Sequence, residues 1–174
     1  MAPRAVFVGA PGAGKSTVGR RVAERLRIPF ADSDALVEKR AGRPVSDIFI
    51  SDGEPQFRTW EREVIAEALA DFTGILSLGG GAILDERTRA ALLDQHVVWL
   101  RVDLAHATQR VGMNSARPLL LGNVRGTMLT MLEQRTPMYA EVADDVIDTS
   151  GRSIKEIVTE AVELLTSQNR TDRT

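Results

Sequence analysis

A glycine-rich segment near the start of the chain has the residue types and spacing that bind phosphate groups. It reads Gly9-Ala-Pro-Gly-Ala-Gly14-Lys15-Ser16-Thr17, which matches the pattern of a glycine, four residues, then glycine, lysine and serine. Glycines let backbone N–H groups turn toward a phosphate, and the helix that follows adds the positive end of its dipole. Lys15 would reach the terminal phosphates, and Ser16 would offer its hydroxyl to Mg2+. The segment therefore predicts a site for a nucleoside triphosphate and magnesium.

The residues on either side of this segment have the hydrophobic patterns of a strand and a helix. Ala5–Val8 is a continuous apolar run, as is typical of a strand buried on both faces of a parallel sheet. After the glycines, Val18, Val22 and Leu26 recur at four-residue spacing among charged residues, which indicates an amphipathic helix. A buried strand, a glycine loop and a helix are the context that the phosphate-binding pattern requires.

Two carboxylates follow the second expected strand, at residues 28–31. Asp32 and Asp34 would lie at the carboxyl end of that strand, where ligands bind in open α/β sheets. Their two-residue spacing on extended chain would aim both side chains toward the phosphate-binding loop. One carboxylate could then hold Mg2+ through water while the other grips a substrate hydroxyl. The residues alone leave equally open that this segment only caps the next helix.

The rest of the chain continues to alternate between strands and helices. Further strands are expected at 75–78, 97–102 and 145–149, and helices at 34–40, 55–70, 85–93, 103–111, 125–142 and 153–165. Pro137 should end or bend the helix that contains it. Residues 112–124 are expected to form a mobile loop and residues 168–174 a frayed tail. The pattern predicts one three-layer α/β/α domain over 1–174, with a five-stranded, mostly parallel sheet.

The composition fits one soluble domain and argues against several classes of protein. The chain has 174 residues, 43% of them hydrophobic, and a formal net charge of -2. That charge disfavours a broad basic face for nucleic acid, and the apolar runs are too short for a membrane span or a signal peptide. The absence of cysteine excludes disulfides and thiolate metal sites and favours a cytoplasmic location. No apolar stripe is left over, so a monomer without nucleic-acid or membrane partners is expected.

Six motifs, in order and spacing, resemble the shikimate kinase family over nearly the whole chain. The phosphate-binding loop and the aspartate pair are two of them; the others are Phe57-Arg58 followed by Glu61, Leu78-Gly-Gly-Gly-Ala82, Asn114-x-x-Arg117-Pro-Leu-Leu120 and Arg135-x-Pro-x-Tyr139. The resemblance implies the P-loop NTPase fold of nucleoside-monophosphate-kinase-like enzymes, with a substrate-binding segment at about 32–61 and a mobile lid at about 112–124. It also implies transfer of the γ-phosphoryl group of ATP to the 3-hydroxyl of shikimate, giving shikimate 3-phosphate and ADP in aromatic amino-acid biosynthesis.

The resemblance also implies which residues hold the acceptor. Asp34 would bind the shikimate hydroxyls and act as the base. Arg58 and Arg135 would clamp the carboxylate, as paired guanidinium hydrogen bonds can. The backbone of Gly79, Gly80 and Gly81 would approach the substrate closely, which a side chain at those positions would block.

The remaining implied roles concern ATP and its metal. Arg117, on the lid, would offset the charge of the transferring phosphoryl group, so the expected catalytic residues are Lys15, Asp34 and Arg117. Mg2+ would be held by Ser16 and Asp32. Arg110 and Arg152 would flank the adenine ring. The residues expected to contact ATP come from the glycine loop and from three arginines: Gly12, Ala13, Gly14, Lys15, Ser16, Thr17, Arg110, Arg117 and Arg152.

Two other functions stay open at this stage. A related small-molecule kinase acting on gluconate would need a similar grip on hydroxyl and carboxylate groups, whereas a nucleoside monophosphate fits that grip poorly. A nucleotide-binding regulatory module would bind ATP without transferring phosphate. Several other residues are expected to be solvated surface charges, core residues or structural histidines: Arg20, Arg21, Arg87, Arg89, Trp60, Trp99, Tyr139, His96 and His106.

Overall fold

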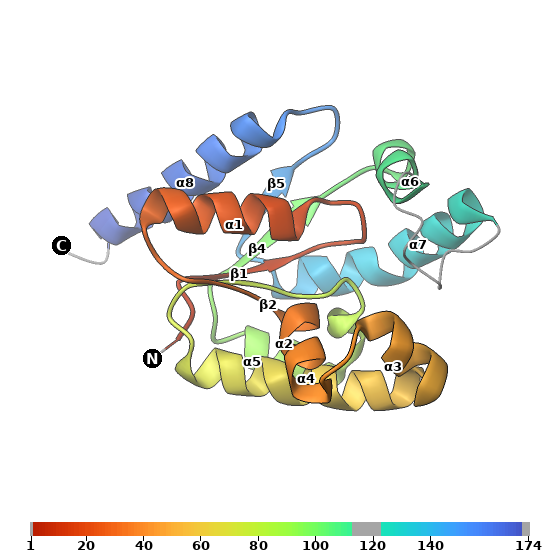
Figure 1. Ribbon diagram of the computed structural model, residues 1–174. Coiled ribbons are helices and arrows are strands. Elements are labelled where there is room, and N and C mark those ends of the chain that lie inside the picture. Colours follow the sequence, from red (N-terminus) through yellow and green to blue (C-terminus); the bar gives the residue numbers. More distant parts are fainter. Residues whose placement is uncertain (1, 113–122, 172–174) are drawn as a thin grey trace.

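Five short strands form a single sheet in which neighbouring strands run parallel (Figure 1). The structure is a computed structural model that describes residues 2–112 and 123–171. The strands are β1 (Ala5–Val8), β2 (Phe30–Asp32), β3 (Ile75–Ser77), β4 (Val97–Arg101) and β5 (Asp145–Asp148). Their order in the sheet is β2-β3-β1-β4-β5. The expected five-stranded sheet is confirmed, and every strand pairing in the described chain is parallel.

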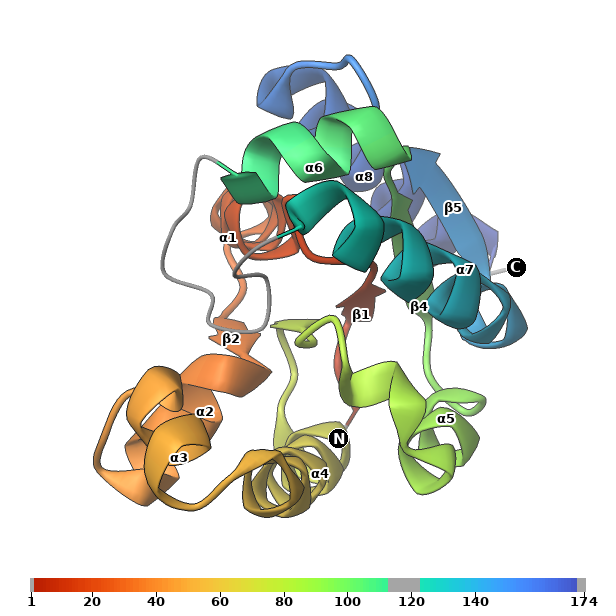
Figure 2. The ribbon, with the colours of Figure 1, turned by 90° about the vertical axis from the view of Figure 1, so that its right-hand side faces the viewer.

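Helices connect the strands and cover the two faces of the sheet. They are α1 (Lys15–Leu26), α2 (Ser33–Ala41), α3 (Val45–Ser51), α4 (Glu54–Asp71), the short 3-10 helix η1 (Ala82–Leu84), α5 (Glu86–Leu92), α6 (Leu104–Gly112), α7 (Val124–Val142) and α8 (Ile154–Thr171). Helices α1 and α8 lie side by side on one face, α4 and α5 lie on the other, and α7 packs beside α5 and β4 (Figures 1 and 2). The expected three-layer arrangement is therefore confirmed.

Two helices differ from the sequence-based prediction. Helix α7 continues through Pro137, so it does not end there as one of the two expected outcomes required; a bend at Pro137 stays a prediction. Pro137 lies on the exposed side of the helix, so the carbonyl that loses its hydrogen bond there can be hydrated instead. Helix α8 extends to Thr171, so the first residues of the expected tail are helical. Most of the expected lid, residues 113–122, lies outside the described residues, and so does the end of the expected tail, residues 172–174.

The core surrounds the central strands, and this arrangement gathers the strand ends at one edge. All four residues of β1 are buried, as are the inward-facing Val18 and Val22 of α1. Because the strands are parallel, the phosphate-binding loop, Asp32 and the Gly79–Gly81 run all follow carboxyl ends at the same edge of the sheet. Within the described residues, none of the helices has the length and apolar character needed to cross a bilayer.

Candidate active site

The phosphate-binding loop, residues 9–17, joins β1 to the start of α1. Gly12 and Gly14 have φ values of 82° and 85°, a backbone conformation that favours glycine. The Ala13 N–H donates to the Ala10 carbonyl at 3.1 Å, which closes the loop. Lys15 is buried at the first position of α1, and its ammonium donates to the same carbonyl at 3.1 Å. The loop therefore places a lysine and a helix N-terminus together, as anion binding requires.

Asp32 links this loop to the second strand. The Ser16 hydroxyl donates to one oxygen of the Asp32 carboxylate, and the other oxygen accepts the Asp34 backbone N–H at 2.9 Å. Asp32 therefore caps α2 and also lies beside the phosphate-binding loop, so the two interpretations that the sequence left open are compatible. Hydroxyl and carboxylate oxygens are donors that suit Mg2+. In the described chain no three His, Cys, Asp or Glu side chains are placed to hold a metal together, so phosphate and water would complete the coordination.

The Gly79–Gly81 run begins against Ser33 and Asp34, in the segment expected to bind the substrate. The Gly79 N–H donates to the Ser33 hydroxyl at 2.8 Å. A Cβ added at Gly79 would lie 2.7 Å from Asp34 Oδ1 and 2.9 Å from Glu61 Oε1, distances shorter than side chains tolerate. This glycine is therefore required for the close approach of two carboxylates to the backbone, and its position explains part of the motif.

The next two glycines bridge the phosphate-binding loop and Arg58. A Cβ at Gly80 would lie 2.8 Å from Pro11 Cδ, in the phosphate-binding loop. A Cβ at Gly81 would overlap the Arg58 guanidinium. The run thus brings Asp34 and Arg58 near the loop that carries Lys15. The predicted substrate site needs these side chains near that loop.

A buried carboxylate holds the Arg58 guanidinium. Arg58 Nη1 donates to Glu61 Oε2 at 2.7 Å, and Glu61 is 2% exposed. Burial raises the pKa of the Glu61 carboxyl to about 7, against the opposing effect of the Arg58 charge. Asp34 raises the same pKa and Arg135 lowers it, so all four groups lie within electrostatic reach of one another. Glu61 Oε1 has no hydrogen-bond partner in the described chain.

Helix α7 adds Arg135 and Tyr139, one turn apart, to these groups. Arg135 is 6% exposed, and its Nε has no hydrogen-bond partner among the described residues. The Tyr139 hydroxyl donates to the Gly80 carbonyl at 2.6 Å. Burial raises the pKa of Tyr139 to about 12, although the Arg135 charge acts in the opposite direction. We call the assembled residues the polar cluster: Asp34, Arg58, Glu61, Gly79–Gly81, Arg135 and Tyr139.

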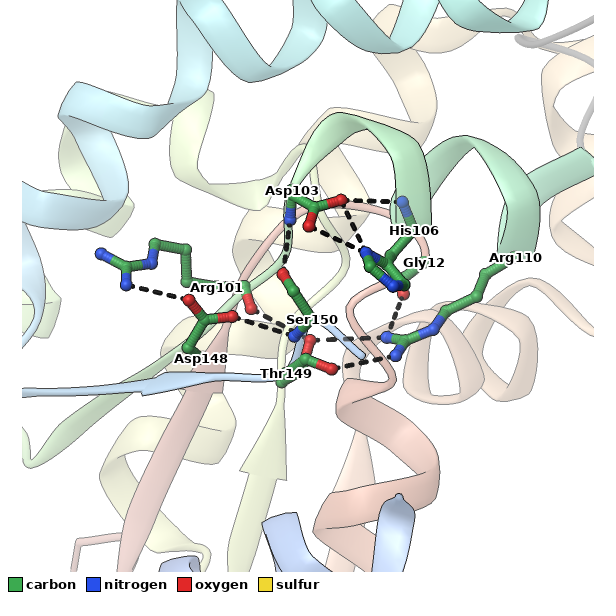
Figure 3. Close-up of polar contacts among 8 residues, drawn as sticks. All are labelled: Gly12, Arg101, Asp103, His106, Arg110, Asp148, Thr149 and Ser150. Atoms are coloured by element: carbon green, nitrogen blue, oxygen red, sulfur yellow. Dashed lines mark hydrogen bonds and ion pairs between the residues drawn. The ribbon is translucent and has the colours of Figure 1, made fainter. Parts of the chain in front are cut away.

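The two arginines expected at the adenine ring, Arg110 and Arg152, both donate to backbone carbonyls at the end of β5, and Figure 3 shows Arg110. Arg110 donates to the Gly12 carbonyl at 2.9 Å and to the Thr149 carbonyl at 3.1 Å, so it joins the phosphate-binding loop to β5. Arg152 donates to the Asp148 carbonyl at 2.9 Å and pairs with Glu160 at 2.6 Å. The structure brings Arg110 to the loop, while contact of either arginine with adenine stays a prediction. Arg117 lies outside the described residues.

Figure 3 also shows a polar network that the sequence did not reveal. The Asp103 N–H donates to the Ser150 hydroxyl at 2.9 Å, and the Asp103 carboxylate accepts the His106 N–H at 2.8 Å. The Arg101 guanidinium donates to Asp148 at 3.0 Å. These contacts tie the ends of β4 and β5 to the start of α6, which carries Arg110. An aspartate three residues before His106 is an N-cap signal that could have found part of this network.

One arginine was assigned wrongly to the solvated surface. The Arg89 side chain is 17% exposed, its guanidinium donates to the Ile83 carbonyl at 2.8 Å, and it pairs with Glu141 of α7 at 3.4 Å. It therefore joins α5 to α7 behind the site. His96 pairs with Asp145 at 2.8 Å, in keeping with the structural role expected for it. Tyr139 is a core residue, as expected, but its hydroxyl reaches the site as well.

Comparison with known proteins points to one family. A family model described as shikimate kinase matches residues 11–166. The chain is 53% identical to the shikimate kinase of Thermobifida fusca over 88% of this chain and 90% of that protein, and 49% identical to that of Saccharopolyspora erythraea over 99% of each. The solved shikimate kinase from Acinetobacter baumannii in complex with shikimate matches with a TM-score of 0.88 and 34% identity, covering 94% of this chain and 93% of that one. A gluconokinase from Sinorhizobium meliloti matches at 20% identity and a TM-score of 0.62, a likeness of fold alone.

Proposed function

We propose how the residues of this site act, starting from the premise that the chain belongs to the shikimate kinase family. It is an ATP-dependent kinase that transfers the γ-phosphoryl group to the 3-hydroxyl of shikimate, giving shikimate 3-phosphate and ADP in aromatic amino-acid biosynthesis. The observation that supports the residue roles is the position of the polar cluster. Its glycine run touches Pro11 of the phosphate-binding loop on one side and Asp34 and Arg58 on the other.

The polar cluster would bind the acceptor. Arg58 and Arg135 clamp the shikimate carboxylate, because guanidinium groups form paired, charge-assisted hydrogen bonds with carboxylates. Asp34 binds the ring hydroxyls and accepts the proton of the 3-hydroxyl as the new phosphorus–oxygen bond forms. The absence of side chains at Gly79, Gly80 and Gly81 lets the backbone approach the substrate closely.

The loop residues would act on the phosphates of ATP. Phosphoryl transfer depends mainly on positioning and charge stabilisation. Lys15 at the start of α1 neutralises the terminal phosphates, with Arg117 adding a second positive charge from the lid. Bound Mg2+ would neutralise phosphate oxygens further, and the oxygens of Ser16 and Asp32 would hold it there. The other nucleotide contacts would come from Gly12, Ala13, Gly14, Thr17, Arg110 and Arg152.

The acceptor assignment is tested by measuring ADP release with ATP and one candidate acceptor at a time. Shikimate should stimulate release strongly, whereas gluconate and nucleoside monophosphates should leave it near the rate without acceptor. Stimulation by gluconate instead would overturn the assignment in favour of a related sugar-acid kinase. Release that no acceptor stimulates would indicate a regulatory module. Gel filtration with light scattering tests the monomer, and cell fractionation tests the cytoplasmic location, both of which we also propose.

A further inference from the structure

A buried tyrosine that is distant in the sequence donates a hydrogen bond to the middle residue of the glycine run. The Tyr139 hydroxyl and the Gly80 carbonyl oxygen are 2.6 Å apart, although 59 residues separate the two in the chain. Tyr139 is 1% exposed, and its ring lies against Trp99, with centroids 5.9 Å apart. A cavity of about 150 Å3 also borders the ring, so packing does not enclose it on every side. The hydrogen bond is therefore the specific contact that joins this side chain to Gly80.

This bond sets the direction of the peptide group between Gly80 and Gly81. A trans peptide is planar, so the Gly80 carbonyl and the Gly81 N–H point in opposite directions. The peptide bonds of the described chain are trans. With the carbonyl held by Tyr139, the Gly81 N–H must point away from Tyr139. Gly81 is also the residue that the Arg58 guanidinium contacts directly.

The Gly81 N–H has no acceptor within the described chain, although Gly81 is buried. Buried N–H groups are nearly always paired, because leaving one unpaired costs about as much free energy as a lost hydrogen bond. An unpaired buried donor beside an arginine that clamps a carboxylate is suited to bind the same anion. The Gly81 N–H is thus a donor prepared for the substrate.

Glycine residues alone would not maintain this orientation. Three consecutive glycines can adopt many backbone conformations, so a peptide between two of them reorients easily. The neighbouring groups are fixed by other contacts: the Gly79 N–H binds Ser33, the Gly79 carbonyl accepts the Ala82 N–H at 3.0 Å, and the Gly81 carbonyl accepts the Leu84 N–H at 3.1 Å. The central carbonyl is held by Tyr139.

We propose that Tyr139 is a positioning residue for shikimate, which holds the Gly80–Gly81 peptide so that the Gly81 N–H donates to the substrate carboxylate beside Arg58. This inference rests on the proposed binding of shikimate by the polar cluster. Because burial keeps the pKa of Tyr139 near 12, its hydroxyl stays a donor throughout the neutral pH range.

The test replaces Tyr139 with phenylalanine, which keeps the ring and removes only the hydroxyl. We expect Tyr139→Phe to raise the KM for shikimate about threefold to tenfold, the range for one lost hydrogen bond, and to leave kcat and the KM for ATP within about twofold. Thr88→Val is the matched control, since Thr88 is a buried hydroxyl residue of α5 outside the polar cluster. An unchanged KM for shikimate in Tyr139→Phe, or an equal rise in Thr88→Val, overturns the proposal.

A second measurement uses the wild-type protein and does not depend on the folding of a variant. In protein labelled with 15N-glycine, the Gly81 amide resonance should shift on addition of shikimate, and much less with the carboxamide of shikimate. A Gly81 resonance that shikimate leaves in place overturns the proposal. Shikimate-dependent ADP release by the same wild-type sample tests the proposed function separately, so the two failures are distinguishable.

Discussion

Glu61 accepts a hydrogen bond from Arg58 at 2.7 Å while itself being almost fully buried. Burial raises the pKa of the Glu61 carboxyl to about 7, so its charge changes near neutral pH. Burial alone would lower the pKa of Arg58, but the charges and hydrogen bonds of Glu61 and Glu54 outweigh it, and the net shift is upward. The guanidinium that we assign to the substrate carboxylate is thus oriented by a group that gains and loses a proton under ordinary assay conditions.

The stability of the protein should therefore depend on pH through Glu61. Its pKa is about 7 in the folded state and near 4.5 in the unfolded state. Between these values the folded state binds more protons, so the free energy of unfolding falls as pH rises from 4.5 to 7. The decrease is on the order of 3 kcal/mol. Glu61→Gln has no proton to lose and should lack this decrease. Urea unfolding of both proteins at about pH 5 and about pH 8 measures it, and identical pH dependence would refute the shifted pKa.

Gly79 should be irreplaceable for activity, because two carboxylates occupy the space of its missing side chain. In Gly79→Ala the new Cβ would meet Asp34 Oδ1 at 2.7 Å and Glu61 Oε1 at 2.9 Å. Both side chains must move, and displacement by about 1 Å can cost on the order of a hundredfold in rate. We expect kcat/KM for shikimate to fall at least tenfold. Ala91→Ser, which adds one atom at an exposed residue of α5, is the control and should keep wild-type kcat/KM. Equal activity of the two variants would contradict the assignment.

The strands and the phosphate-binding loop were predictable because their signals are local. A continuous apolar run such as Ala5–Val8 is typical of a strand buried in a parallel sheet, and the spacing of Gly14, Lys15 and Ser16 belongs to one segment. The aspartate pair was predictable in place but not in role, since one side chain caps a helix and also contacts Ser16.

Contacts between distant segments were not predictable from the same signals. The Tyr139 hydroxyl reaches a carbonyl 59 residues away, and the motif that contains Tyr139 does not reveal what its hydroxyl binds. Arg89 has charged and polar neighbours in sequence, as a surface residue would, but it is covered by Glu141 and by the end of η1. Pro137 was expected to end or bend its helix, yet the helix continues past it, and its exposed position lets water bind the carbonyl that loses its hydrogen bond.

The arginines of the polar cluster should govern the binding of shikimate more than the transfer step. Arg58→Ala removes charge-assisted hydrogen bonds that hold the acceptor equally in the ground and transition states, so the KM for shikimate should rise about tenfold to a hundredfold. The same substitution should change the KM for ATP less than about twofold. Arg87→Ala is the matched control, because its side chain is 74% exposed and pairs only with Asp85 in the described structure. A rise confined to the KM for ATP would show that Arg58 binds ATP and not shikimate.

Removal of divalent metal should abolish turnover. The contact between Ser16 and Asp32 predicts that these two residues hold the Mg2+ on which turnover depends. EDTA should stop ADP release, and added Mg2+ should restore it. Ser16→Ala removes one of the oxygens that we assign to Mg2+, so it should raise the Mg2+ concentration needed for half-maximal rate several-fold. Ser167→Ala, the same change at an exposed residue of α8 away from the phosphate-binding loop, is the comparison. An identical Mg2+ requirement in Ser16→Ala would remove this residue from the metal site.

Lys15 should be the side chain whose loss reduces turnover most among the described residues. It is buried at the N-terminus of α1, and its ammonium already lies 3.1 Å from the Ala10 carbonyl, so the charge is held in place before ATP binds. A fixed charge aimed at developing negative charge contributes on the order of a hundredfold to a thousandfold in rate, because the protein does not have to reorganise during the reaction. Lys15→Ala should therefore lower kcat by at least about a hundredfold while the thermal unfolding midpoint stays near that of the wild type. Lys155→Ala removes an exposed lysine from α8 and should leave kcat unchanged. Turnover by Lys15→Ala at the rate of Lys155→Ala would show that the phosphate-binding loop does not carry out the transfer.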